Sequence, residues 1–388
     1  MDRYDVIVLG LGAMGAATAW QLARRGVRVL GIDRFDPPHR FGSSHGDTRI
    51  TRLAIGEGAH YSPLAMRSHA IWREVEAETG AELMTTTGML LISSTATRAS
   101  VHVPHFFRNT IAAAERYGIA HERLDAAAMR RRFPQFAVAD DELGYFEPDA
   151  GFLRPEACIR AQLELARRAG TEILTDEDVD GLSVSGDGIK LFGRETWAAD
   201  RLVLCMGAFL PEFLPSELGA LFEVRRQVLH WFDLDGDPAP FEPGRCPVFI
   251  WELPVEDRVI YGFPAVDGPA GGVKLATEQQ GEATDPNSAW ADVGRDEARD
   301  MHRDCVEGFM PQVSNRTLRS VACLYTVTPD AGFVIDTLPG NDRVTVVSAC
   351  SGHGFKHSAA IGEAVAERLV DGASRLDLSA CGWGRFAR

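Results

Sequence analysis

Continuous apolar runs alternate with helically spaced segments at the start of the chain. Residues 4–10 (YDVIVLG) and 27–33 (VRVLGID) contain β-branched residues and have no polar face, which predicts strands buried on both sides. Between them, residues 16–26 (AATAWQLARRG) place apolar side chains at helical spacing and end at Gly26. The chain therefore begins with a strand, a helix and a second strand, the order of a parallel α/β sheet.

Segments of the same character return late in the chain. Residues 199–209 (ADRLVLCMGAF) form a buried strand that runs into Gly207, and residues 343–372 combine a buried strand, a Gly-His-Gly turn and a long amphipathic helix. Between them, residues 223–234 and 258–266 alternate like strands of an antiparallel sheet. An α/β fold (α+β by segment) is therefore predicted, with a Rossmann-like domain assembled from separated segments and a second domain built on an antiparallel sheet. The first domain is assigned residues 1–80, 145–215 and 320–388, and the second, a substrate domain, residues 81–144 and 216–319.

Composition excludes several classes of protein. The 388 residues are 45% hydrophobic and 24% charged, as in globular proteins, and the net charge of −15 argues against nucleic acid or an anionic membrane as a partner. No apolar run is long enough for a transmembrane helix, and the first residues lack the features of a signal peptide. The seven cysteines are odd in number and show no CxxC spacing, which favours reduced thiols in the cytoplasm over disulfides or a metal site.

Three glycines follow the first predicted strand in a dinucleotide-binding pattern. Gly10, Gly12 and Gly15 fit G-x-G-x-x-G at the strand-to-helix turn, and Asp33 ends the second strand about twenty residues later. Gly10 permits the tight turn, Gly12 lets the backbone approach a pyrophosphate, and Asp33 can accept a hydrogen bond from a ribose hydroxyl. The fingerprint does not separate FAD from NAD. A nucleotide domain made of separated segments, interleaved with an antiparallel domain, is typical of FAD oxidoreductases and decides in favour of FAD.

Several longer stretches carry a resemblance to one family. They include DVIVLGLGAMG, FDPPHRFGSSHGDTRITR, YSPLAMRSHAIW, YGFPAVDGPAGGVKL, VACLYTVTPDAGFVID and SGHGFKHSAAIGE, and they run from residue 4 to about residue 365. The sequence resembles the monomeric sarcosine oxidase and N-methyltryptophan oxidase family of FAD-dependent amine oxidases. The HGDTR, CLYT and SGHGFK matches are more specific than the glycine fingerprint.

The resemblance implies a covalently bound cofactor. Taken alone, Cys323 in VACLYT would be a buried structural cysteine. In the family, the cysteine of this motif is attached to the flavin ring as an 8α-thioether, which implies covalent FAD at Cys323. The other cofactor-binding residues assigned in this way are Gly10, Gly12, Ala13, Met14, Gly15, Asp33, Arg34, Ser43, Ser44, Thr48, Val179, Gly207, Gly352, His353, Gly354, Phe355 and Lys356. For His353, the backbone is expected to serve the flavin while the ring points elsewhere.

Catalytic roles follow from the same matches. Lys274 in GGVKLAT would ordinarily be a solvated lysine, but the family's lysine at this motif faces the flavin and activates oxygen. A cation held there stabilises the negative charge that develops on oxygen. His45 and Arg49 belong to the basic loop 42–52, which is otherwise a solvated surface loop, and with Tyr325 they are assigned to the catalytic site. No metal is expected.

Substrate binding is predicted at a set of cations and apolar residues. Arg52 and Lys356 match the family's carboxylate-binding residues, and an arginine fork suits a carboxylate. Tyr261 and Ile250 match positions in the substrate cavity. Glu278 departs from the family's histidine, and short insertions lie before Tyr261 and Lys274. If Glu278 pairs with Lys274, or if it faces the cavity and meets a donor on the substrate, a substrate larger than sarcosine is expected. The alternative is that Glu278 points to solvent and changes nothing.

These assignments together predict a monomeric FAD-dependent oxidase of secondary or N-methyl amino acids. It would produce an imine that hydrolyses and would reduce O2 to H2O2. One alternative is a flavin dehydrogenase that passes electrons to another acceptor, against which Lys274 argues. A weaker alternative is a nucleotide-binding protein without catalysis, against which Arg52 and Lys356 argue.

Overall fold

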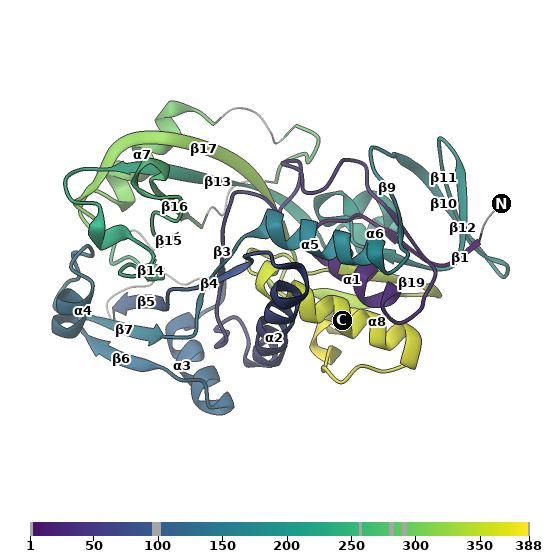
Figure 1. The fold of residues 1–388 in the computed structure, drawn as a ribbon, viewed down its shortest axis with the longest axis horizontal. Helices are drawn as coiled ribbons and strands as arrows, with labels where there is room; N and C mark the ends of the chain where they lie inside the picture. Colours follow the sequence, from purple (N-terminus) through teal and green to yellow (C-terminus); the bar gives the residue numbers. More distant parts are fainter. Residues whose placement is uncertain (1–2, 95–101, 256–257, 279–282, 289–292, 387–388) are drawn as a thin grey trace.

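Five parallel strands form the centre of the first sheet, in the order β9-β2-β1-β12-β19 (Figure 1). The structure is a computed structural model that describes residues 3–94, 102–255, 258–278, 283–288 and 293–386. Positions 256–257, which fall in the predicted insertion before Tyr261, lie outside the described residues. The strands of this sheet are β1 (Arg3–Leu9), β2 (Val29–Ile32), β9 (Glu172–Leu174), β10 (Val179–Ser185), β11 (Gly188–Gly193), β12 (Thr196–Leu204), β18 (Val334–Leu338) and β19 (Asn341–Ser348).

The central strands β1 and β2 are buried on both faces, as their continuous apolar sequence predicted. Val6 and Val8 of β1 pack against helices on one face, whereas Ile7 and Leu9 join a second core on the other. On the helical face, α1 packs against both α5 and α8, and α2 packs against α8 (Figure 1). These helices are α1 (Ala13–Ala23), α2 (Ser62–Thr79), α5 (Pro155–Arg168) and α8 (Ser358–Asp371).

The second sheet has the order β17-β13-β16-β15-β14-β5-β7-β6. Neighbouring strands are antiparallel except β14 and β5, which run parallel. The predicted strands 223–234 and 258–266 are found as β13 and the shorter β15. The domain boundaries predicted at 144/145 and 319/320 fall inside β7 and β17, and the division into domains stays a prediction. The strands are β5 (Met89–Ser94), β6 (Glu122–Asp125), β7 (Glu142–Glu147), β13 (Glu223–Leu234), β14 (Val248–Glu252), β15 (Val259–Gly262), β16 (Val273–Thr277) and β17 (Val313–Val327).

A small third sheet, β3-β8-β4, completes the described architecture. Its strand β3 begins at Arg49, so the predicted basic loop 42–52 is in part a strand. Its strands are β3 (Arg49–Thr51), β4 (Met84–Thr86) and β8 (Gly151–Leu153), and the remaining helices are α3 (Phe106–Tyr117), α4 (Ala126–Arg132), α6 (Ser216–Gly219) and α7 (Arg295–Cys305). Within the described residues, no helix has the length and apolar character needed to cross a membrane.

Candidate active site

One continuous cavity joins the two large sheets. It begins at the carboxyl ends of β1 and β2, passes the loop before β3, and ends at side chains of β14 to β17. Every residue assigned to a site from the sequence lines this cavity, with the exception of Gly15 and His45. The sequence therefore located a single site formed by segments that lie far apart in the chain.

The glycines of the first turn have different tasks. Gly10 has φ +88, and a Cβ there would lie 2.5 Å from the carbonyl oxygen of Cys205, so only glycine fits. A Cβ on Gly15 would overlap the carbonyl oxygen of Gly10. Gly15 therefore lets α1 pack against the turn and does not reach the cavity, which corrects its assignment as a cofactor-binding residue. At Gly12 a Cβ would meet only Ser44 Oγ, at 3.7 Å, and would point into the cavity.

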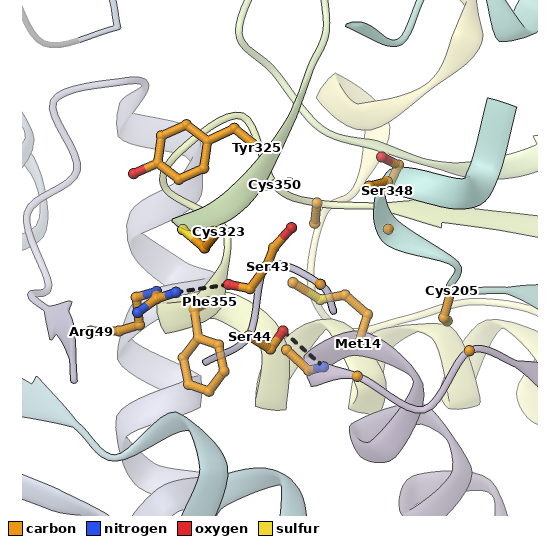
Figure 2. Close-up of a pocket in the computed structure, with 18 of the residues that line it drawn as sticks. Met14, Ser43, Ser44, Arg49, Cys205, Cys323, Tyr325, Ser348, Cys350 and Phe355 are labelled. Atoms are coloured by element: carbon orange, nitrogen blue, oxygen red, sulfur yellow. Dashed lines mark hydrogen bonds between the residues drawn. The ribbon is translucent and has the colours of Figure 1, made fainter. Parts of the chain in front are cut away.

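The N-terminus of α1 has the properties of an anion site. Gly12 caps the helix without a side-chain hydrogen bond, and no acidic residue stands in the first turn of this fully described helix. Ala13 N lies 3.4 Å from Ser44 Oγ (Figure 2). Uncapped N–H groups and the helix dipole favour a phosphate at such a terminus. This end of the cavity fits the pyrophosphate of FAD.

Asp33 fixes the turn that contains the glycines. Its Oδ2 accepts a hydrogen bond of 2.6 Å from Leu11 N, and its Oδ1 accepts one of 2.9 Å from Phe35 N. The carboxylate is buried and lines the cavity. A carboxylate has about four acceptor sites, so lone pairs remain for the ribose hydroxyl that the fingerprint predicts.

At the other end of the cavity, Cys323 and Tyr325 of β17 lie beside the loop that carries Ser43 and Arg49 (Figure 2). Cys323 is buried; burial raises the pKa of its thiol, while the charges of Arg49 and Lys274 oppose this shift. Ser43 Oγ is buried and has no hydrogen-bond partner among the described residues. A buried hydroxyl of this kind fits a polar group of a bound cofactor, because an unmade hydrogen bond is costly.

Two cations lie next to each other beneath the basic loop. A Cβ on Gly46 would lie 3.7 Å from Arg49 Nη1 and 3.9 Å from Lys274 Nζ. Arg49 donates to the carbonyl oxygens of Thr48 (2.9 Å) and Ser43 (2.8 Å). Neighbouring like charges favour an anion beside them, which suits a reduced flavin.

Lys274 is surrounded by three acceptors. Its Nζ lies 2.7 Å from the carbonyl oxygen of Gly46, 2.8 Å from that of Thr48 and 3.1 Å from Thr48 Oγ1. Burial and the nearby charge of Arg49 lower its pKa well below the ordinary value. An ammonium has three donors and no acceptor, so these three oxygens match the number of donors of the charged form.

His45 does not belong to the cavity wall. Its side chain is buried behind the loop, and Nε2 has no hydrogen-bond partner among the described residues. Burial lowers its pKa to about 3, and Arg49 and Lys274 add to the shift. The ring is therefore neutral at pH 7, and the assignment of His45 to the catalytic residues that face the flavin is corrected.

The Gly-His-Gly turn also differs from expectation in one respect. The ring of His353 points away from the cavity centre, as predicted: Nε2 lies 3.0 Å from the carbonyl oxygen of Ala331, and the ring stacks on Phe333 at 4.5 Å. Its backbone N–H, however, donates to the carbonyl oxygen of Cys350 at 2.9 Å. The N–H expected to face the flavin is thus already used within the turn.

The predicted carboxylate-binding cations surround a carboxylate of the chain itself. Arg52 Nη2 lies 2.6 Å from Glu57 Oε2, and Lys356 Nζ donates to the carbonyl oxygen of His353 at 2.6 Å. Burial disfavours the charge of Glu57, but Arg52 and Lys356 outweigh this and hold its pKa well below the ordinary value. Burial lowers the pKa of Lys356 to about 7, against the opposing effect of Glu57. Sequence reasoning missed Glu57, although it lies only five residues after Arg52.

The far wall of the cavity combines phenols with an ion pair. The hydroxyls of Tyr261 and Tyr325 are 3.3 Å apart, and Ile250 lies on the same strand layer. Glu278 pairs with the ring of His102, a second residue that sequence reasoning missed. Because the Nζ of Lys274 contacts Gly46 and Thr48, the alternative in which Glu278 neutralises Lys274 is wrong, and Glu278 faces the cavity.

The sequence and the fold are both similar to known proteins. Residues 5–368 match the family described as FAD dependent oxidoreductase (DAO). The chain is 39% identical to a monomeric sarcosine oxidase of Streptomyces avermitilis over 95% of this chain and 94% of the relative. It is 33% identical to an N-methyl-L-tryptophan oxidase of Yersinia pestis over 99% of each. Among solved structures, NikD, an amino acid oxidase essential for nikkomycin biosynthesis, has a TM-score of 0.82 at 24% identity over 98% of each chain.

Proposed function

This chain belongs to the DAO family of FAD-dependent oxidoreductases, and on that basis we propose that it oxidises secondary or N-methylated amino acids. The supporting observation is that Lys274, Arg52 and Lys356 line the same cavity as the dinucleotide turn. Relatives at 39% and 33% identity are named for oxidation of sarcosine and N-methyl-L-tryptophan. The product is an imine, which water hydrolyses.

When bound, FAD supplies a two-electron acceptor that takes a hydride equivalent from the carbon next to nitrogen and passes the electrons to O2, giving H2O2. The protein binds the substrate through its carboxylate, which joins Glu57 as a second partner of Arg52 and Lys356. Charge-assisted contacts of this kind fix orientation. Tyr261, Tyr325 and Ile250 enclose the amine and exclude bulk water.

Lys274 acts in the oxidative half of the cycle. Its ammonium is held by the loop before β3, so the charge is already in place when oxygen arrives. Preorganised charge stabilises the negative charge that develops on oxygen without the cost of reorienting solvent. This role separates an oxidase from a dehydrogenase that uses another acceptor.

We also propose covalent attachment of FAD to the sulfur of Cys323, which lines the cavity beside Arg49 and Lys274. Both cations favour the thiolate that attachment requires. Acid-precipitated protein should therefore stay yellow, and Cys323→Ser should release its colour into the supernatant. If the supernatant of acid-precipitated wild-type protein contained all of the FAD, covalent attachment would be refuted, while the proposed oxidation reaction would be unaffected.

The protein is further proposed to be a cytoplasmic monomer. The relatives named above include an enzyme described as monomeric, and all seven cysteines of this chain are free thiols. Reduced thiols are typical of intracellular proteins. Light scattering of the purified holoenzyme measures the oligomeric state directly.

The test of function is a substrate panel read by two signals. Under anaerobic conditions, sarcosine, proline, pipecolate, N-methyltryptophan and N-methyl amino acids with polar side chains are each mixed with the yellow holoenzyme. A substrate should bleach the flavin, and admission of air should restore the colour and release H2O2. Bleaching without reoxidation by air would indicate a dehydrogenase, and no bleaching by any member would contradict the proposed function.

A further inference from the structure

His102 presents a free imidazole nitrogen to the substrate end of the cavity. The residue precedes α3 and lines the cavity next to Gly352 of the Gly-His-Gly turn. Its Nδ1 is paired with Glu278 Oε1, and its backbone N–H donates to Glu278 Oε2 at 3.3 Å. Both oxygens of Glu278 are thus occupied by one residue. Within the described residues, Nε2 of His102 has no hydrogen-bond partner.

The ion pair determines which nitrogen carries the proton. A carboxylate accepts hydrogen bonds, so Nδ1 must carry the hydrogen that faces Glu278. In the neutral ring Nε2 is then an acceptor, and in the protonated ring the positive charge stands against Glu278. This is the arrangement by which an acid orients a histidine that serves as a base.

The free nitrogen lies beside residues of the reaction site. A Cβ on Gly352 would be 3.0 Å from His102 Nε2 and 3.0 Å from Tyr325 Cε2, so the imidazole edge and the phenol ring both lie over this glycine. Tyr325 also contacts Tyr261 through its hydroxyl. The base is therefore at the wall that encloses the amine in the proposed function.

Three other titratable groups around His102 are not available as proton acceptors. The ring of His353 lies 5.5 Å away, but its Nε2 contacts Ala331 and burial lowers its pKa to about 3. Glu57 interacts electrostatically with His102, yet it is paired with Arg52 and also faces Lys356. Burial raises the pKa of Tyr325, which therefore stays a neutral phenol.

We propose that His102 Nε2 accepts the proton that the substrate's ammonium must lose before oxidation. This inference rests on the proposed function, because only a neutral amine has a lone pair from which oxidation can proceed. The N–H bond of the ammonium breaks, its electron pair stays on nitrogen, and the proton forms a new bond to Nε2. Glu278 remains ionised and stabilises the imidazolium, and no other reactant is needed.

The assignment gives Glu278 a function. A carboxylate alone could not replace a ring nitrogen in this cavity, but a carboxylate that holds a histidine from another segment can. The substrate class follows: amino acids that enter as zwitterions, with a secondary ammonium group and a carboxylate for Arg52 and Lys356.

The direct test measures the protonation state of His102 and does not depend on turnover. Histidine-selective 13C labelling at Cε1 resolves His102, identified by the signal missing in His102→Gln. The ligand is 2-aminoisobutyrate, whose carbon next to nitrogen has no hydrogen and which cannot be oxidised there. At a pH where the free enzyme shows a neutral ring, saturating ligand should move the His102 signal to the imidazolium position. Isobutyrate, the same acid without nitrogen, should not move it.

Variants separate the base from a structural role. In His102→Gln, kcat/KM at pH 7 should fall roughly 100-fold, a typical loss for a general base, while the deficit shrinks at high pH where the free amine is abundant. Glu278→Gln should show the same pattern with a smaller loss. His105→Gln changes an exposed histidine three residues away and should behave like wild type.

Two results would overturn the proposal. One is a His102 signal that stays neutral with ligand bound, or that is already an imidazolium without ligand. The other is a His102→Gln variant whose pH profile of kcat/KM parallels that of wild type. If wild type itself fails to oxidise any amino acid of the panel, the proposed function fails, which is a different outcome.

Discussion

The two ends of the cavity are built by different means. At the nucleotide end, the wall is backbone: glycines without Cβ atoms, uncapped N–H groups of α1, and Asp33 holding the turn. At the substrate end, the wall is made of charged side chains that pair with one another, Arg52 with Glu57 and His102 with Glu278.

This difference predicts how each end responds to change. Backbone contacts leave no space for extra atoms, so the nucleotide end tolerates no substitution at its closest points. Charged side chains have further donors to offer, so a substrate carboxylate can join Glu57 beside Arg52 and Lys356.

Gly15→Ala and Gly12→Ala should separate folding from cofactor binding. In Gly15→Ala the new methyl group overlaps the carbonyl oxygen of Gly10, and we expect no folded, yellow protein. In Gly12→Ala the methyl group meets only Ser44 Oγ and enters the cavity, so the chain should fold but bind no FAD. Circular dichroism and flavin absorbance measure the two properties.

Gly186→Ala provides the control for these variants, because nothing lies within 4 Å of its added Cβ. It should match wild type in both measurements. A yellow Gly12→Ala protein would show that the turn does not approach the cofactor as closely as the fingerprint requires.

Lys274→Met should slow reoxidation by oxygen by about 10²–10³-fold, the loss seen when one preorganised electrostatic group is removed. The ammonium is the group that the three oxygens of Gly46 and Thr48 hold in place. Stopped-flow mixing of reduced enzyme with O2 measures this step. Anaerobic reduction by substrate should change much less, and equal slowing of both steps would contradict the division of labour.

Arg52→Ala should weaken substrate binding by roughly 1.5–3 kcal/mol, the range for a hydrogen bond to a charged group. It should also lower the free energy of unfolding by roughly 3–5 kcal/mol, because Glu57 is left buried beside one cation instead of two. Arg52→Ala with Glu57→Ala should restore much of the stability but none of the binding. Chemical denaturation and ligand titration read the two effects.

The carboxylate contact has its own check. An amide analogue of a good substrate should be oxidised far more slowly than the free acid, since Arg52 and Lys356 would lose their partner. If the amide is oxidised equally well, or if the double variant binds the acid as wild type does, these cations serve Glu57 alone.

The same contrast explains what the sequence could predict. Strand β1, the glycine turn, α1 and Asp33 lie within about thirty residues of one another in the chain. Close packing in this segment requires glycine at fixed positions, and the resulting spacing can be recognised in the sequence. Parallel strands returning as β12 and β19 could likewise be read from continuous apolar runs. Gly15 was assigned to cofactor binding, because the glycine pattern alone does not distinguish a residue that contacts the ligand from one that lets the helix pack against the turn.

The substrate end could be located but not assembled from the sequence. His102 and Glu278 are 176 positions apart, and although Glu278 was marked by its place in the motif, His102 belongs to no pattern that marks it. Glu57 is near Arg52 in sequence, but an acid beyond a strand end has no periodicity that would predict an ion pair. His45 shows the converse: the neighbouring Arg49 and Arg52 are basic and line the cavity, whereas the ring of His45 is buried behind it and neutral.

The smallest effect expected is the pH dependence of stability that Glu57 contributes. Arg52 and Lys356 hold the folded-state pKa of Glu57 well below its ordinary value of 4.5. Above pH 4.5 the carboxylate is ionised in both states, and its full contribution to stability is present. As the pH falls below that value, Glu57 becomes protonated in the unfolded chain but stays ionised in the folded protein. The free energy of unfolding therefore decreases until the pH has passed below the folded-state pKa. The slope is at most about 1.4 kcal/mol per pH unit for one group.

Glu57→Gln should remove this loss of stability in acid, whereas the variant Glu78→Gln, which changes an exposed glutamate, should retain it. Urea denaturation of all three proteins between pH 3 and 6 measures the slopes, and a Glu57→Gln protein that loses stability in acid as steeply as wild type would mean that this ion pair is not what distinguishes the substrate end.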